Sequence, residues 1–385
     1  MRWDRSAKRW PAWAGLAVLL LLVVSGVGGG CAPGDAEAGP EDGGRGDRGG
    51  GVVRITHVSY DPTRALFRAF NREFAAWWAT QRGQRVEIRA SHGGSARQAR
   101  AVNDGLAADV VSLALPVDVD AIARQSGRVS ADWRSWFPHN ASPFTSSVVF
   151  VVRKGNPKGI ADWDDLARPG VGVVMANPRT SGGAKVNYFS AWVYGLRRSG
   201  GDAAAAEAFV RDVFRNVVVL DTGSRGASTT FAQRRIGDVL VTWENEALLL
   251  LREFADRRGL EVEVVVPSLS VLAEPSVAVV EVGVDGGGAL RRAVAEAYVG
   301  WMFSERGQAL AAAHFFRPRD ASVAAEVGLP RPAVLVTMEE VFGGWTEGHT
   351  VHFGPGGVSE RVMSQTGANV RGRGSAGAAS AGGGS

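Results

Sequence analysis

Four short segments place small and hydroxyl-bearing residues where an expected strand gives way to an expected helix. They contain Asp61, then His92 and Ser95, then Ser181, Gly182 and Gly183, and last Ser224 and Arg225. The first backbone N–H groups of a helix have no partner inside the helix, and neighbouring glycines let an anion come close to them. Each segment alone is typical of an ordinary turn or helix cap. Their recurrence along one chain predicts an anion site made of several helix starts.

Trp243 adds a donor of a different kind, at the end of the stretch GDVLVTWENEA. Its indole N–H donates a hydrogen bond and cannot accept one. A single tryptophan at such a position is more often a core residue. Trp243 therefore becomes a candidate ligand residue only in combination with the four segments.

Metal and catalytic chemistry find less support in the sequence. His349 and His352 have the spacing of a metal-binding pair, but no cysteine or evident third ligand accompanies them, so we expect no metal. Lys185 is followed by Val186 rather than by the Ser or Thr of a phosphate-binding P-loop. Ser95 lacks the second glycine of a hydrolase nucleophile elbow. We therefore expect neither an enzyme nor a cofactor.

Strand and helix signals alternate around these segments. VVRITHVSY, residues 52–60, is typical of a strand, and Asp61-Pro62 then marks a helix start. The helix that follows carries an apolar stripe at spacings of three and four, formed by Leu66, Phe67, Phe70, Phe74 and Trp77. Further apolar strands follow, separated by short Gly/Ser/Asp loops. This pattern predicts a parallel α/β architecture, in which ligands bind at the carboxyl ends of strands beside the next helix.

The first residues form a distinct segment with the pattern of an export signal. A basic start precedes the apolar run WAGLAVLLLLVVSGV and the small residues before Cys31, which predicts a signal peptide over residues 1–30. We expect lipidation at Cys31, although Gly28 stands where the lipoprotein motif usually has leucine. The alternative is an uncleaved anchor with an idle thiol. Either way we expect an exported protein, in the periplasm or on the outer face of the cell membrane.

Length and charge limit the remaining possibilities. The chain has 385 residues, enough for two domains. Its formal net charge is +4, of which residues 1–30 contribute most, so the rest of the chain is close to neutral. A nucleic-acid partner is not expected, since such proteins carry a clustered basic surface. Residues 31–51 have the composition of a flexible tether, and the tail from about residue 367 that of a disordered segment.

Several motifs stand in the order found in one known family. The chain is similar to the periplasmic sulfate-binding proteins, the solute receptors of sulfate/thiosulfate ABC importers, from about Val52 to Trp345. The motifs are VSYDPTRALF, SHGGSARQARAV, ADVVSLAL, VVRKGNPKGIADWDDL, NPRTSGGAKVNY, GDVLVTWENEALL, AEPSVAVV, FFRPRD and EVFGGW. The resemblance implies a monomeric receptor that passes its ligand to a permease with a cytoplasmic ATPase.

The same resemblance implies a two-lobed, type II periplasmic-binding-protein fold with the ligand cleft between the lobes. Lobe 1 would comprise residues 52–141 and 247–345, and lobe 2 residues 142–246. The chain would cross between the lobes near residues 142–148 and 243–249. Residues 346–385 would form a C-terminal extension.

The resemblance also assigns roles to the residues singled out above. The ligand would be held by the N–H groups of Asp61, Ser95, Gly182, Gly183 and Ser224, the hydroxyls of Ser95 and Ser181, and the indole of Trp243. His92, Lys185 and Arg225 would lie behind these donors. Two positions depart from the family: Ser224 replaces a common alanine, and Lys185-Val186 replaces Arg-Trp. The carboxylate of Asp61 should point away from the anion, capping its own helix or pairing with an arginine such as Arg225.

A pocket made only of donors favours sulfate over phosphate. Sulfate has only acceptor oxygens, whereas phosphate keeps an O–H that would face a donor, at a cost of about 1–3 kcal/mol. Three alternatives stay open: a receptor for thiosulfate, molybdate or phosphate, an ester hydrolase, and a structural lipoprotein that keeps the fold without the pocket.

Overall fold

The first sheet contains the βα units predicted at the start of the folded chain. In the computed structural model, which describes residues 51–254, 261–281, 288–329 and 332–366, its strands run in the order β11-β3-β1-β2. These strands are β1 (Val53–Tyr60), β2 (Val86–Gly93), β3 (Val110–Leu113) and β11 (Ser276–Val279). β1 is parallel to β2 and β3, and β11 is antiparallel to β3. The predicted signal peptide, Cys31 and nearly all of the tether lie outside the described residues, as does the tail from residue 367.

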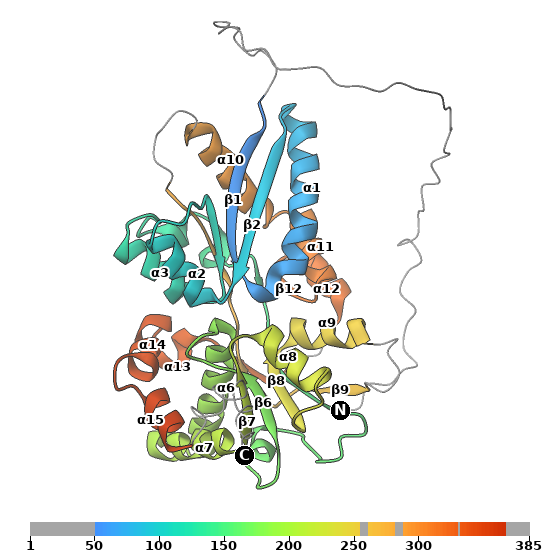
Figure 1. Cartoon of the computed structure of the whole chain (residues 1–385), viewed down its shortest axis with the longest axis vertical. Helices are drawn as coiled ribbons and strands as arrows, with labels where there is room; N and C mark the ends of the chain where they lie inside the picture. Colours follow the sequence, from blue (N-terminus) through green and yellow to red (C-terminus); the bar gives the residue numbers. More distant parts are fainter. Residues whose placement is uncertain (1–50, 255–260, 282–287, 330–331, 367–385) are drawn as a thin grey trace, which may run out of the picture. The chain divides into compact units, whose positions relative to one another are not determined.

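The helices of this part connect and cover the first sheet. In Figure 1, α1 (Arg64–Arg82) lies beside β2. The others are α2 (Ser95–Asn103), α3 (Pro116–Gln125), α4 (Pro138–Ala141), α10 (Gly288–Trp301), α11 (Glu305–Ala313) and α12 (Ala321–Val327), with short 3-10 turns at Asp61–Thr63 and Trp133–Ser135. The apolar stripe of α1 differs from the prediction at one position. Trp78 is buried and Trp77 is 38% exposed, because the stripe continues from Phe74 by a step of four.

The second sheet has the order β7-β6-β8-β5-β9. Its strands are β5 (Val148–Arg153), β6 (Val173–Ala176), β7 (Val217–Asp221), β8 (Val239–Trp243) and β9 (Val262–Val265). β6 is parallel to β7 and β8, whereas β5 is antiparallel to β8 and β9. Its main helices are α5 (Trp163–Leu166), α6 (Gly182–Arg198), α7 (Ala203–Arg215), α8 (Ser224–Ala232) and α9 (Glu244–Phe254). Two-stranded pairs join β4 (Phe144–Thr145) to β12 (Arg317–Pro318) and β10 (Leu269–Val271) to β13 (Val334–Val336).

The lobe boundaries expected from the sequence need correction on the C-terminal side. Residues 247–345 were expected in lobe 1, yet β9 pairs with β5, and α9 packs its Ala247 and Leu250 against strands of the second sheet. α9 follows β8 directly, and β9 is the next described strand after it. The chain therefore stays with the second sheet beyond residue 246.

The last helices also belong with the second sheet. α13 (Met338–Phe342), α14 (Trp345–Phe353) and α15 (Val358–Gln365) lie close to α6 and α7 in Figure 1. Met338, Trp345 and Val362 are part of the apolar core that contains Tyr188 and Phe189 of α6. Residues 338–345 were expected in lobe 1 and the rest in an extension. Burial of this shared core explains why they dock here instead.

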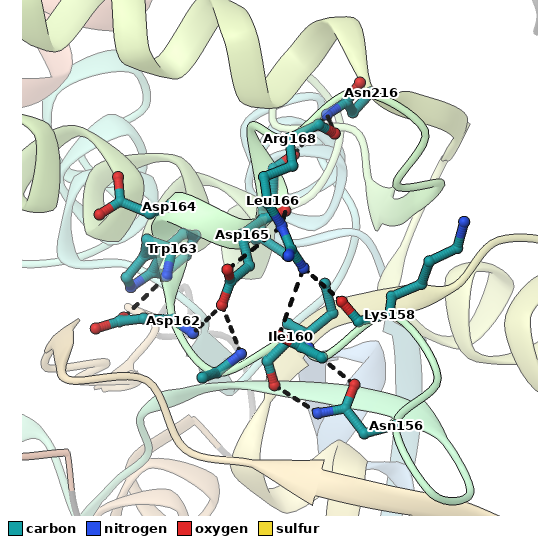
Figure 2. Close-up of polar contacts among 12 residues, drawn as sticks. Asn156, Lys158, Ile160, Asp162, Trp163, Asp164, Asp165, Leu166, Arg168 and Asn216 are labelled. Carbon is teal, nitrogen blue, oxygen red and sulfur yellow. Dashed lines mark hydrogen bonds and ion pairs between the residues drawn. The ribbon is translucent and has the colours of Figure 1, made fainter.

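The loop after β5 is ordered by its own side chains, as Figure 2 shows. Asn156 donates to the carbonyl of Ile160 at 2.7 Å and accepts from its N–H at 2.9 Å. Asp162 and Asp165 form a capping box at the start of α5. This loop lies in the motif VVRKGNPKGIADWDDL, whose Asn and Asp side chains bond to nearby backbone groups and so fix the local backbone shape.

Within the described ranges, no helix combines the length and the apolar character that a membrane crossing needs.

Candidate functional site

Each predicted donor segment lies at the end of a strand, where the next helix or helical turn begins. Asp61 opens the 3-10 turn that leads from β1 into α1, and Ser95 is the first residue of α2. Ser181 caps α6, whose first two residues are Gly182 and Gly183. Ser224 is the first residue of α8, and Trp243 is the last residue of β8. The N-terminus of a helix carries about half a positive charge, so these starts supply positive potential without a charged side chain.

The start of α6 lies directly against the start of α2. A methyl group on Gly182 would stand 2.9 Å from the Cβ of Ala114 and 3.1 Å from the Cβ of Ser95. A methyl group on Gly94 would stand 2.9 Å from the carbonyl oxygen of Thr180. The two glycines thus permit a backbone approach that no other residue allows.

The other two segments join the same cluster. A methyl group on Gly183 would stand 3.4 Å from Nε1 of Trp243 and 3.6 Å from Oγ of Ser224. The rings of Trp243 and Tyr60 meet edge to face, with their centroids 6.0 Å apart, and α8 contacts the turn that begins at Asp61. The structure therefore brings the four predicted segments and Trp243 together.

Ser95 differs from the prediction in the use of its hydroxyl. Its Oγ donates to Oδ2 of Asp118 at 2.5 Å and accepts from the N–H of Ala114 at 2.9 Å. The hydroxyl is therefore committed within the protein, and the backbone N–H is the group that Ser95 can offer to a ligand. Burial raises the pKa of Asp118, while Lys185 and the Ser95 hydroxyl act in the opposite direction. Sequence reasoning missed Asp118, because nothing in the motif LPVDVDAI distinguishes it from a helix-start carboxylate.

Ser181 and Trp243 also contact the first turn of α6. Oγ of Ser181 accepts from the N–H of Ala184 at 3.4 Å, which leaves the hydroxyl proton for another acceptor. The buried indole of Trp243 donates to the carbonyl of Gly183 at 3.0 Å. The indole is therefore at the predicted place, with its N–H directed to the backbone of α6.

The carboxylate of Asp61 pairs with Arg64 at 3.1 Å, not with Arg225 as the sequence suggested. Arg225 instead pairs with Glu253 at 3.4 Å. The choice follows from local geometry, since Asp61 and Arg64 are three residues apart in consecutive helical turns. Asp61 therefore pairs with a nearby arginine, one of the two expected arrangements, but the arginine is Arg64 and not the suggested Arg225.

His92 lies behind the first segment, bonded through Nδ1 to Oγ of Ser59 at 2.6 Å. Burial lowers its pKa to about 4, with Arg64 and Arg68 adding to the shift and Asp61 opposing it. His92 is therefore neutral at physiological pH and positions Ser59 by hydrogen bonding.

Lys185 is buried and donates to Nε2 of His349 on α14 at 2.8 Å. Burial lowers its pKa, and Asp118 raises it in part. Burial, with Lys185 next, lowers the pKa of His349 to about 4, so its imidazole is neutral and can accept this bond. Lys185 therefore links the first turn of α6 to the C-terminal helices.

The two histidines with metal-like spacing have separate partners. Nε2 of His349 faces Lys185, and Nδ1 of His352 is hydrogen-bonded to the hydroxyl of Tyr188 at 2.9 Å. Among the residues that the structure describes, no group of three or more His, Cys, Asp or Glu side chains could hold a metal ion. The pair is explained by packing against α6.

A further buried carboxyl lies close to the cluster and was not singled out in the sequence. Glu246 of α9 is 3% exposed, and burial raises its pKa to about 7 against the opposing charge of Arg225. It lines a cavity of about 70 Å³ between α8 and α9, together with Arg225, Ser228 and Glu253. Only its position in the motif WENEA could have drawn attention to it.

Comparison with known proteins gives a consistent answer over most of the chain. The family of bacterial extracellular solute-binding proteins matches residues 61–317. The chain is 49% identical over 314 residues to the sulfate-binding protein of Escherichia coli, covering 81% of this chain and 94% of that one. It is 46% identical over 311 residues to the thiosulfate-binding protein of Pseudomonas aeruginosa, covering 80% and 92% of the two chains.

Solved structures agree with the sequence relatives. The sulfate-binding protein SubI from Mycobacterium tuberculosis superposes with a TM-score of 0.68 at 33% identity, covering 77% of this chain and 97% of that one. The periplasmic binding protein AfuA from Actinobacillus pleuropneumoniae superposes with a TM-score of 0.54 at 14% identity, covering 81% and 97%, which supports the fold alone.

Proposed function

The chain belongs to the bacterial extracellular solute-binding proteins, in the family of the sulfate-binding proteins, and from that premise we propose that it captures sulfate for an ABC importer. Sulfate would be bound outside the cytoplasm and handed to the permease subunits, which work with a cytoplasmic ATPase. The receptor itself would perform no chemistry and need no cofactor or metal.

One observation carries this proposal: the starts of α2, α6 and α8 and the turn at Asp61 meet at Gly182, Gly183 and Trp243. A dianion placed there would face several helix N-termini at once, each with unpaired backbone N–H groups. Hydrogen bonds from such groups to a charged acceptor are about twice as strong as neutral ones. Binding without a salt bridge is therefore physically reasonable.

The proposed donors are those named from the resemblance, except that the hydroxyl of Ser95 is left out because it is bonded within the protein. They are the N–H groups of Asp61, Ser95, Gly182, Gly183 and Ser224, the hydroxyl of Ser181 and the indole of Trp243. To reach a ligand, the indole N–H must leave the carbonyl of Gly183, 3.0 Å away. His92, Lys185 and Arg225 would act indirectly, by holding the elements that carry these donors.

The arrangement of nearby carboxylates supports sulfate over phosphate. Asp61 is paired with Arg64, and Asp118 accepts a hydrogen bond from the Ser95 hydroxyl, so both carboxylates already have partners within the protein. A phosphate O–H would then face a donor, and an unpaired buried group costs about 1–3 kcal/mol. Sites of this kind can reject the wrong analogue by about 10⁴-fold.

Thiosulfate is the second candidate ligand. A relative that is 46% identical over 311 residues is a thiosulfate-binding protein. Thiosulfate has the charge and nearly the shape of sulfate, so the same donors would serve both anions.

We also propose that the protein is exported as a monomer and held to the membrane through a lipid on Cys31. The chain would cross between its lobes near residues 142–148 and again between Val271, which packs in the core of the second sheet, and β11 in the first sheet. The lobes would close over the anion by a hinge motion. The closed form would be the one that the permease recognises.

Isothermal titration calorimetry of the mature protein tests the function directly. The titrants are sulfate, thiosulfate, phosphate and molybdate at neutral pH. We expect tight binding of sulfate, with a change in tryptophan fluorescence because Trp243 would contact the anion. If phosphate displaced sulfate at neutral pH, the donor-only reasoning would be wrong.

A further inference from the structure

The position of the Ser224 side chain is not explained by the proposed role of its backbone N–H. Its Oγ and Nε1 of Trp243 both lie within 3.6 Å of the point where a methyl group on Gly183 would stand. Ser224 is partly buried, and among the described residues its hydroxyl has no hydrogen-bond partner. The hydroxyl therefore lies beside the first turn of α6, in the region where the proposed donors converge.

Helix capping does not account for this hydroxyl. Serine caps a helix from the residue before its first turn, where the side chain accepts a backbone N–H. In α8 that place is taken by Gly223, and Ser224 is already the first helical residue. The side chain of Ser224 is thus not needed to start the helix.

We propose that the Ser224 hydroxyl is an additional donor to the bound anion and that it favours sulfate over thiosulfate. This inference rests on the proposed function and adds a side-chain contact to the backbone contact already assigned to Ser224. Gly183 lies beside both donors, since a Cβ there would stand 3.4 Å from Nε1 of Trp243 and 3.6 Å from Oγ of Ser224.

The preference follows from the acceptors that each anion offers. Sulfate has four equivalent oxygens, so an added donor always finds a strong acceptor. Thiosulfate replaces one oxygen by sulfur, which is larger and accepts hydrogen bonds weakly. When donors surround the anion, the sulfur must face one of them, and a buried donor with a poor partner is unfavourable. Each donor added to the pocket therefore increases the disadvantage of thiosulfate.

Calorimetry with sulfate and with thiosulfate on the mature wild-type protein and on Ser224→Ala tests the inference. We expect the variant to bind sulfate about 10-fold or more weakly, the loss of one hydrogen bond to a charged group. Thiosulfate affinity should fall by less, so the ratio of the two affinities should decrease. Ser224→Thr, which keeps the hydroxyl, should restore most of the sulfate affinity.

Ser228→Ala is the matched control, since it removes a buried hydroxyl one turn further along α8, on the side of the cavity near Glu246. It should leave both affinities unchanged. If Ser224→Ala bound both anions like the wild type, or lost both equally, the inference would be overturned. If the wild type bound neither anion, the proposed function itself would fail, which is a separate result.

Discussion

Replacing Gly182 by alanine should hold the start of α6 away from the start of α2. The new methyl group would stand 2.9 Å from the Cβ of Ala114, 3.1 Å from the Cβ of Ser95 and 3.4 Å from the Cγ of Leu115. Non-bonded carbon atoms pack at about 3.5–4.0 Å, so the two helix starts must separate by roughly 0.5–1 Å. The backbone of Gly182 has no positive φ, so alanine itself fits the helix.

That separation should act on binding rather than on folding. The N–H groups of Ser95 on one side and of Gly182 and Gly183 on the other are proposed to hold a single anion. A shift of this size lengthens the bonds on one side, and each bond to a charged group contributes about 1.5–3 kcal/mol. Losing one or two of them amounts to roughly 1.5–6 kcal/mol, or about 10-fold to 20,000-fold in sulfate affinity.

Calorimetry gives the affinity, and thermal unfolding without ligand gives the stability. Gly300→Ala is the matched control, because a methyl group there would have no neighbour within 4 Å. We expect Gly182→Ala to lose affinity while its unfolding temperature stays near that of the wild type. An affinity within about twofold of the wild type, with unchanged unfolding, would refute the idea that anion binding needs these two helix starts in contact.

Three further outcomes are expected. Trp243→Phe should weaken sulfate binding by about 1–3 kcal/mol and abolish most of the fluorescence change, as measured by calorimetry and emission spectra; full retention of both would remove the indole from the site. Burial lowers the pKa of His57 to about 3, from 6.5, so the folded state binds fewer protons than the unfolded chain. The contribution of His57 to the free energy of unfolding should be fully present above pH 6.5 and should decrease as the pH falls from 6.5 to about 3, by at most roughly 1.4 kcal/mol per pH unit. Urea unfolding at several pH values measures this free energy, and a profile that does not change with pH would contradict the prediction. Cys31→Ala should move the protein from the membrane fraction to the soluble fraction of the producing cell, and an unchanged distribution would argue against a lipid at this residue.

The helix starts could be predicted because the signals for them are local. Asp61-Pro62, Ser181 and the glycines around them act through the backbone of their own turn, and the strands before them are apolar runs. The parallel arrangement of β1 and β2 follows from the helix between them. The general rule for open α/β sheets places such segments at the carboxyl ends of their own strands. That segments of two different sheets share one site was implied by the resemblance to the two-lobed family.

Partner choices could not be predicted, because they depend on geometry between distant segments. The hydroxyl of Ser95, for example, is bonded to Asp118, 23 residues further along the chain. Likewise β9 joins the second sheet and α14 docks on α6, although neither segment has a marker of its partner. Long-range contacts of this kind are set by which apolar faces remain uncovered once the nearer elements have packed.

The docking of α13, α14 and α15 on α6 has a consequence for biosynthesis. The ribosome releases the chain N-terminus first, so α6 exists long before the segment that covers Tyr188 and Phe189 has been made. Until residues 338–365 emerge, the second lobe lacks part of its own interior and keeps an apolar surface open to solvent. The half of the fold that contains α6 therefore reaches its mature form only when translation is nearly complete.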